Sequence, residues 1–134
     1  MDAETSPKRL KQIFTKYVQQ SYAVHRTKNI QQAFSYDPKI LTEPYLVEFM
    51  LTCMSGINGK HKVLPIFYTV KETIENSGNV TDTTFYSIMK NKKPREEYEY
   101  FIKRISQYLA KKEKISFVEA KKRVTKPIND YVTE

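Results

Sequence analysis

Apolar side chains near the start of the chain recur with the spacing of one helical face. The stripe consists of Leu10, Ile13, Phe14, Tyr17 and Val18, and lysines occupy the other faces. Ser6 and Pro7 form a typical helix start, because serine caps a first turn and proline fits its first position. The pattern therefore predicts an amphipathic helix from Ser6 that either runs to about residues 33–34 or breaks near residues 25–26.

The next segment is apolar nearly all round a helix, which is typical of the most buried helix of a bundle. Thr42 is placed to cap this helix, and Pro44 fits its first turn. Gly56 and Gly59 are expected to end it. Its apolar residues are Tyr45, Leu46, Val47, Phe49, Met50, Leu51, Cys53 and Met54.

Two helices are predicted downstream. The first opens at Pro65 and stops at Gly78, with Ile66, Phe67, Val70 and Ile74 facing inward. The second is short and begins after Thr81 as N-cap, and it directs Phe85, Ile88 and Met89 towards the core.

The last third of the chain predicts two more helices. A basic loop over residues 90–93 ends at Pro94, and a longer amphipathic helix follows. Glu96 and Glu97 are expected in its first turn, where the helix dipole favours acids. Residues 116–119 have the pattern of a capping box that opens a final helix, which Pro127 is expected to stop. The stripe of the longer helix is Tyr98, Phe101, Ile102, Ile105 and Leu109.

The helices on either side of Gly78 are arranged as in a helix-turn-helix, where a scaffold helix precedes a helix with short polar outer residues. Val80 and Phe85 can anchor the second helix to the core. Hydroxyl and carboxylate side chains can face outward, where hydroxyls bond base edges or phosphates. These outward positions are Thr81, Asp82, Thr83, Thr84, Tyr86 and Ser87, and the DNA backbone would be gripped by Lys90, Lys92, Lys93 and Arg95.

From Val80 to Leu109, the run NVTDTTFYSIMKNKKP and the amphipathic helix after it resemble the lambda-repressor/Cro-like family of helix-turn-helix DNA-binding proteins. The resemblance implies that Asp82, Thr83 and Tyr86 or Ser87 face the major groove. It also implies phosphate contacts from Thr81, Lys90, Lys92 and Lys93. Asn91, within the basic loop, completes the predicted interface.

These elements predict an all-α fold, a compact five- or six-helix bundle that contains a helix-turn-helix. A chain of 134 residues can bury one modest core, so we expect a single helical domain over residues 1–134. Within it, residues 1–36 form a basic N-terminal helix or arm, residues 40–112 the helix-turn-helix core and residues 116–126 a C-terminal helix.

Positive charge is concentrated in one part of the chain. The formal net charge is +8, and residues 90–126 alone carry 13 basic and 5 acidic side chains. Such a segment favours a polyanionic partner, nucleic acid first, although lysines can also merely solubilise helix surfaces. The N-terminal helix is a dimerisation arm, a further element that contacts the nucleic-acid backbone, or one more bundle helix. Its basic residues are Lys8, Arg9, Lys11, Lys16, Arg26 and Lys28.

Signals of enzymatic chemistry are weak. His25 and His61 stand alone in sequence, and no metal-binding, phosphate-cradling or nucleophile motif is present. Cys53 lies in an apolar helix and is expected to be an inert core residue. We therefore expect no enzyme activity, cofactor or metal, and no membrane span or signal peptide, which predicts a cytoplasmic protein.

The sequence predicts a sequence-specific double-stranded DNA-binding protein, a small transcription or replication regulator of the phage or plasmid type that acts as a homodimer. The alternative is a helical protein-interaction module, an inhibitor or adaptor whose basic face binds an acidic protein partner.

Overall fold

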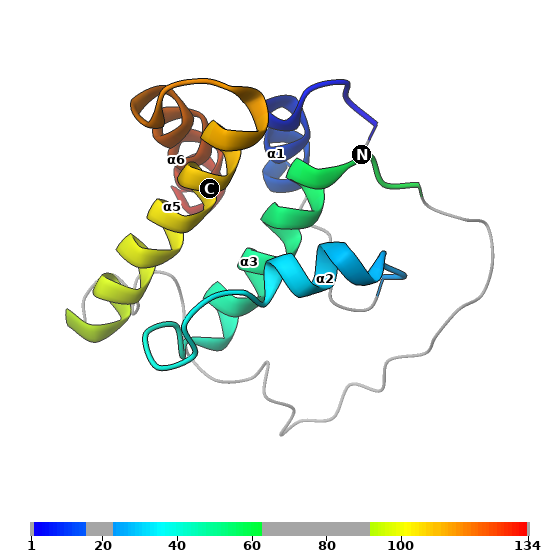
Figure 1. Ribbon diagram of the computed structural model, residues 1–134. Helices are drawn as coiled ribbons and strands as arrows, with labels where there is room; N and C mark the ends of the chain where they lie inside the picture. Colours follow the sequence, from blue (N-terminus) through cyan, green and yellow to red (C-terminus); the bar gives the residue numbers. More distant parts are fainter. Residues whose placement is uncertain (1, 16–22, 63–91, 134) are drawn as a thin grey trace.

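A computed structural model describes residues 2–15, 23–62 and 92–133 of the chain. All regular secondary structure in these residues is α-helical, which confirms the predicted fold class. The helices are α1 (Ser6–Thr15), α2 (Thr27–Ala33), α3 (Pro44–Asn58), α5 (Lys92–Glu113) and α6 (Phe117–Thr133) (Figure 1). The helices predicted between residues 65 and 89, and the helix-turn-helix that they would form, lie outside the described residues.

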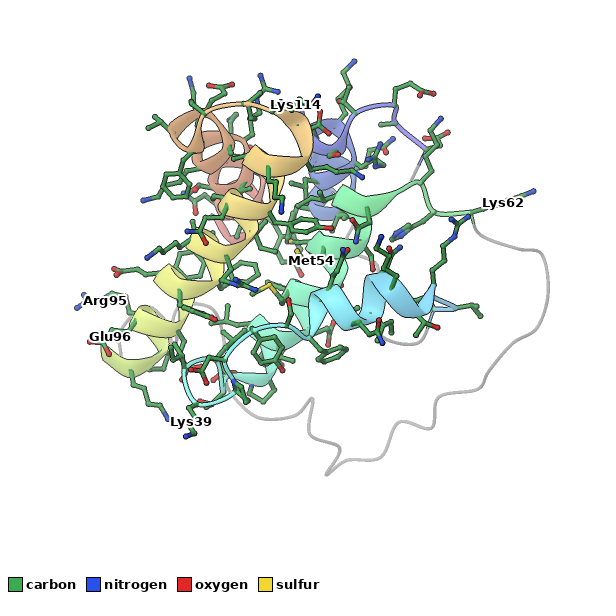
Figure 2. The ribbon with its side chains drawn as sticks, viewed as in Figure 1. Lys39, Met54, Lys62, Arg95, Glu96 and Lys114 are labelled. Atoms are coloured by element: carbon green, nitrogen blue, oxygen red, sulfur yellow. The ribbon has the colours of Figure 1, made fainter. Side chains whose placement is uncertain are left out.

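Helix α3 is the central helix, as its apolar composition predicts. Each residue from Phe49 to Ile57 is buried. Helices α1, α2 and α5 all pack against α3, which is drawn in green in Figure 1. Met54 lies near the middle of the molecule in Figure 2, on the buried length of this helix.

Helix α1 belongs to the core rather than to a separate arm. Leu10, Ile13 and Phe14 are buried, while Tyr17 and Val18 of the predicted stripe lie outside the described residues. Helix α2 begins only at Thr27, after residues 24–26 that are not helical. Of the two alternatives for this region, the structure therefore shows the break near residues 25–26.

Gly56 does not end α3, contrary to the sequence prediction. The helix continues to Asn58, and the backbone N–H of Gly59 then caps it by donating to the Ser55 carbonyl at 3.1 Å. A Cβ atom at Gly56 would lie 2.5 Å from Ile13 Cδ1. The glycine therefore lets α1 approach α3 closely instead of stopping it.

Helices α5 and α6 form a long hairpin along one side of the molecule (Figure 1). Pro127 was expected to stop the last helix, yet α6 runs through it to Thr133. The reason is that apolar positions continue beyond the proline: Ile128 is fully buried, and the Tyr131 ring lies 5.8 Å from the Phe14 ring. Burial of Ile128 and the ring contact of Tyr131 offset the hydrogen bond that proline removes.

Helix α5 begins earlier than predicted. Lys92 and Lys93 are its first residues, so they belong to the helix and not to a loop. Pro94 is tolerated because the first turn needs no intrahelical N–H donor. Glu96 and Glu97 consequently lie in the second turn rather than the first.

Glu97 serves another helix. Its buried carboxylate accepts hydrogen bonds from the Thr42 amide at 2.6 Å, the Thr42 hydroxyl at 2.7 Å and the Glu43 amide at 2.6 Å. These donors precede Pro44, where α3 begins, so Glu97 closes the N-terminus of α3. Thr42 takes part in the cap as predicted, but through a carboxylate of α5.

The other end of α3 is closed by Arg9 of α1, which is only 6% exposed. Its guanidinium donates to the carbonyls of Gly56 at 2.6 Å and Ile57 at 3.1 Å. It also donates to the Ala3 and Glu4 carbonyls and to the Ser6 hydroxyl. All five N–H donors are thus satisfied, and a positive charge lies at the helix C-terminus, where the dipole favours it.

Glu113, at the end of α5, closes the first turn of α1. Its carboxylate accepts from the Ser6 amide at 3.3 Å and from the Ser6 hydroxyl. Helix α5 therefore supplies one carboxylate to each of two other helices, and this fixes its direction relative to both.

Candidate nucleic-acid interface

Most of the predicted DNA-binding residues cannot be placed. Lys93 and Arg95 are exposed near the start of α5, and Lys92 is in the same helix with its side chain outside the description. The residues that lie wholly outside the described part of the chain are Thr81, Asp82, Thr83, Tyr86, Ser87, Lys90 and Asn91.

The start of α5 has mixed charge. Lys93 Nζ lies 4.0 Å from Glu97 Oε1, one helical turn away. Exposed Glu96 and Glu99 follow on the same helix, and Figure 2 shows Arg95 and Glu96 close together at this end. Carboxylates this near weaken the attraction of Lys93 and Arg95 for phosphates.

The other end of the hairpin is strongly basic. We call Lys111, Lys112, Lys114, Lys121 and Lys122 the basic turn; they come from the end of α5, the connection and the start of α6. All five are exposed, and none forms an ion pair within the described residues. Glu119, in the first turn of α6, pairs with Arg123 at 2.6 Å, and further along the helix Lys126 pairs with Asp130 at 3.3 Å.

The carboxylate nearest in sequence to the basic turn is engaged elsewhere. Glu113 accepts hydrogen bonds from Ser6 of α1 and faces that helix. Glu113 therefore does not form an ion pair with its lysine neighbours within the described residues. Figure 2 shows Lys114 at the edge of the molecule, away from Arg95 and Lys39.

Backbone geometry holds the basic turn in place. Lys114 has φ 54, the left-handed conformation that glycine adopts most easily. The Ile115 amide donates back to the Ala110 carbonyl at 3.2 Å, which closes α5. Ser116 Oγ accepts from the Glu119 amide at 3.2 Å and caps α6, as the capping-box pattern predicts. Placing a lysine where the backbone favours glycine costs conformational free energy. This cost points to a use for the lysine's charge.

The two ends of α5 are far apart. At 1.5 Å per residue, Lys93 and Lys112 are separated by about 28 Å along the axis, or roughly eight base pairs of duplex DNA. The predicted phosphate contacts and the basic turn are therefore distinct surfaces that only an extended polyanion can contact together.

A groove of ≈ 580 Å³ lies between α5 and α6, below the basic turn. Tyr98, Ile102 and Phe117 form its apolar part, and Lys103 and Lys121 stand beside them. The Tyr98 hydroxyl donates to Asn129 Oδ1 at 3.4 Å, and burial raises the pKa of Tyr98 to about 12. The groove is thus apolar inside, and its charged border consists of two lysines and Glu99.

Catalytic and metal-binding arrangements find little support among the described residues. No group of three His, Cys, Asp or Glu side chains that could hold a metal occurs in this part of the chain. Cys53 is fully buried, and burial raises the pKa of its thiol, which keeps it protonated. His25 Nδ1 lies 3.2 Å from Ser55 Oγ, but Ser55 is buried within α3.

His61 also lies near Ser55, so the fold brings together two histidines that stand apart in sequence. Burial lowers the pKa of His61, and nearby His25 lowers it further. The pair lies beside Ser55, near the end of α3.

The basic turn is absent from the DNA-binding residues predicted from sequence. The signal that points to it is the run KKEKISFVEAKK, in which lysines flank a helix stop and a helix start. No protein-family model, curated protein or solved structure matches this chain. None of the described helices is long and apolar enough to cross a membrane.

Proposed function

We propose that this protein binds double-stranded DNA and that the basic turn supplies phosphate contacts. The observation that carries the proposal is the set of five exposed lysines, unpaired within the described residues, on a turn whose backbone is fixed at both sides. Lysines in this state release counterions from DNA on contact, which makes binding favourable and dependent on salt.

In this proposal the lysines position the protein and other residues read sequence. Base reading would come from the helix-turn-helix predicted around Thr83 and Ser87, with Lys93 and Arg95 contacting phosphates at the start of α5. A homodimer that binds two half-sites would then act as a small regulator of transcription or replication.

The salt dependence of duplex binding tests the proposal. Replacing Lys111, Lys112 and Lys114 by Gln should lower the slope of log K against log salt by about 0.9 for each lysine that contacts a phosphate. The matched control is Lys39→Gln, which removes an exposed lysine at the opposite end of the molecule (Figure 2). If the wild-type protein shows no salt-sensitive binding to duplex DNA, the proposal fails.

A second candidate function rests on the groove between α5 and α6. Its apolar part and bordering Lys103 and Lys121 suit an acidic protein segment with apolar side chains. An association that survives nuclease treatment and is lost in Phe117→Ser, a change at an exposed residue of the groove, would favour this module. A DNA-mediated association would disappear with nuclease and would be insensitive to that substitution.

A further inference from the structure

Two adjacent apolar side chains are exposed beside the basic turn. Phe117 is 42% exposed and Val118 is 77% exposed, and both lie in the first turn of α6. Leaving such side chains in water forgoes the favourable free energy of burying them. Together they form a small apolar point on a charged surface.

The pair is held rigidly. Ser116 caps the turn on which both residues lie, and Ile115 is tied back to the Ala110 carbonyl. Phe117 also lines the groove with Tyr98 and Ile102, so one side of its ring is supported. The two side chains are presented by a capped helix start.

Lysines surround the pair. Lys121 and Lys122 lie three and four residues after Val118, which places them next to it on the helix surface. Lys114 precedes the pair in the turn, and Lys103 stands across the groove from Phe117. Glu119, the nearest acid on α6, is bonded to Arg123. Glu99 also lines the groove, but lysines outnumber acids around this apolar point. The point is therefore complementary to a partner that is apolar inside and anionic outside.

We propose that Phe117 and Val118 form a wedge that enters the minor groove of duplex DNA and opens a base step, while the basic turn holds the adjacent phosphates. This inference rests on the proposed function. Apolar wedges of one or two side chains are sufficient to unstack a base step, and they bend the duplex by about 20–90°. The stacked bases supply the apolar interior, and the phosphates supply the anionic exterior.

The small size of the apolar point selects DNA over an anionic membrane. A membrane-bound helix buries a whole apolar face in the lipid. Further along α6, Ala120, Val124 and Ile128 are buried in the core, and the Tyr131 ring, although 36% exposed, packs against Phe14 and Phe49. Phe117 and Val118 are thus an exposed apolar pair at the start of the helix, which fits one base step.

The test is bending of a duplex with fluorophores at its two ends, measured by energy transfer. The wild-type protein should raise energy transfer on binding. Val118→Ser and the double variant Phe117→Ser/Val118→Ser should lose this rise while keeping the salt slope of binding. Val24→Ser is the matched control, because Val24 is 84% exposed and lies far from α6 in sequence. Circular dichroism checks that each variant is folded. If the double variant is unfolded, the result for Val118→Ser alone decides the test.

The failure of the wedge is distinguishable from the failure of DNA binding. Salt-sensitive binding without bending, or bending unchanged in Val118→Ser, overturns the wedge and leaves DNA binding intact. Absence of any duplex binding overturns both. Binding to phosphatidylcholine vesicles that contain phosphatidylserine, abolished by Val118→Ser, would assign the pair to a lipid surface and overturn the wedge.

Discussion

The Glu97 carboxylate of α5 accepts both the amide and the hydroxyl of Thr42, at 2.6 and 2.7 Å, at the entrance to α3. The two residues are 55 positions apart in sequence. Their contact joins the loop before α3 to the second turn of α5. Because Glu97 is 3% exposed, water cannot replace it readily.

Glu97→Ala should therefore destabilise the protein. The Thr42 and Glu43 amides would lose their acceptor at a partly buried site, which costs about 1–2 kcal/mol of unfolding free energy. Urea denaturation followed by circular dichroism measures the change. The control is Glu99→Ala, an exposed position on the same helix, where a change within about 0.5 kcal/mol is expected. Equal losses in the two variants would contradict the capping role.

The same carboxylate should make stability depend on acid. Burial would raise the pKa of Glu97, but the hydrogen bonds from Thr42 and Glu43 outweigh it and hold the pKa below its ordinary 4.5. A lowered carboxyl pKa adds stability above pH 4.5, and this is lost as the pH falls through the folded-state pKa. Unfolding free energies of wild type and Glu97→Gln should therefore converge below pH 4.5; a gap that stays constant down to acidic pH would exclude the linkage.

Arg9→Met should destabilise the protein although both side chains are long. The Gly56 carbonyl would lose its guanidinium donor, and the Ile57 carbonyl would keep only the Ser6 hydroxyl. The positive charge at the C-terminus of α3 would also disappear. We expect a loss of about 1.5–3 kcal/mol, the range for hydrogen bonds to a charged group. Lys8→Met changes an exposed neighbour on the same helix and should be nearly neutral in the same thermal or urea titration.

Gly56 and Ile13 should be energetically coupled. A methyl group at position 56 meets Ile13 Cδ1 at 2.5 Å, and Ile13→Val removes that atom. Gly56→Ala should consequently be more favourable by about 1 kcal/mol in the Ile13→Val background than in the wild type. A double-mutant cycle of unfolding free energies measures the coupling, and additive single effects would show that α1 moves aside freely.

Lys114→Gly should change stability and DNA binding in opposite directions. Glycine removes the steric cost of φ 54 and should raise the unfolding free energy by about 1 kcal/mol. If Lys114 contacts a phosphate, the same variant binds duplex DNA more weakly, with a salt slope lower by roughly one unit. Lys112→Gly, at a helical position, should lose stability instead.

Local patterns predicted most of the described helices, because an apolar stripe and a cap depend on residues that are close in sequence. The stripe of α1, the buried α3 and the Ser116 cap follow from this. Long-range interactions decided where these predictions were wrong. Pro127 does not stop α6, because Ile128 packs in the core, and Gly56 does not stop α3, because α1 crosses there.

The candidate site could be predicted only in part, for a similar reason. The high charge of residues 90–126 is visible in the sequence, but its effect depends on where each acid points. Glu96 and Glu99 stay beside Arg95 on the surface, whereas Glu113 is directed towards Ser6. This difference makes the end of α5 more basic than its start.

The caps supplied by α5 also bear on how the chain is synthesised. Glu113, the acceptor for Ser6, is synthesised 107 residues after it, and Glu97, the acceptor for Thr42, is synthesised 55 residues after it. Helices α1 and α3 therefore leave the ribosome before their caps exist. We expect the nascent N-terminal half to stay incompletely folded and open to chaperones until α5 emerges, and the native core to form late and cooperatively.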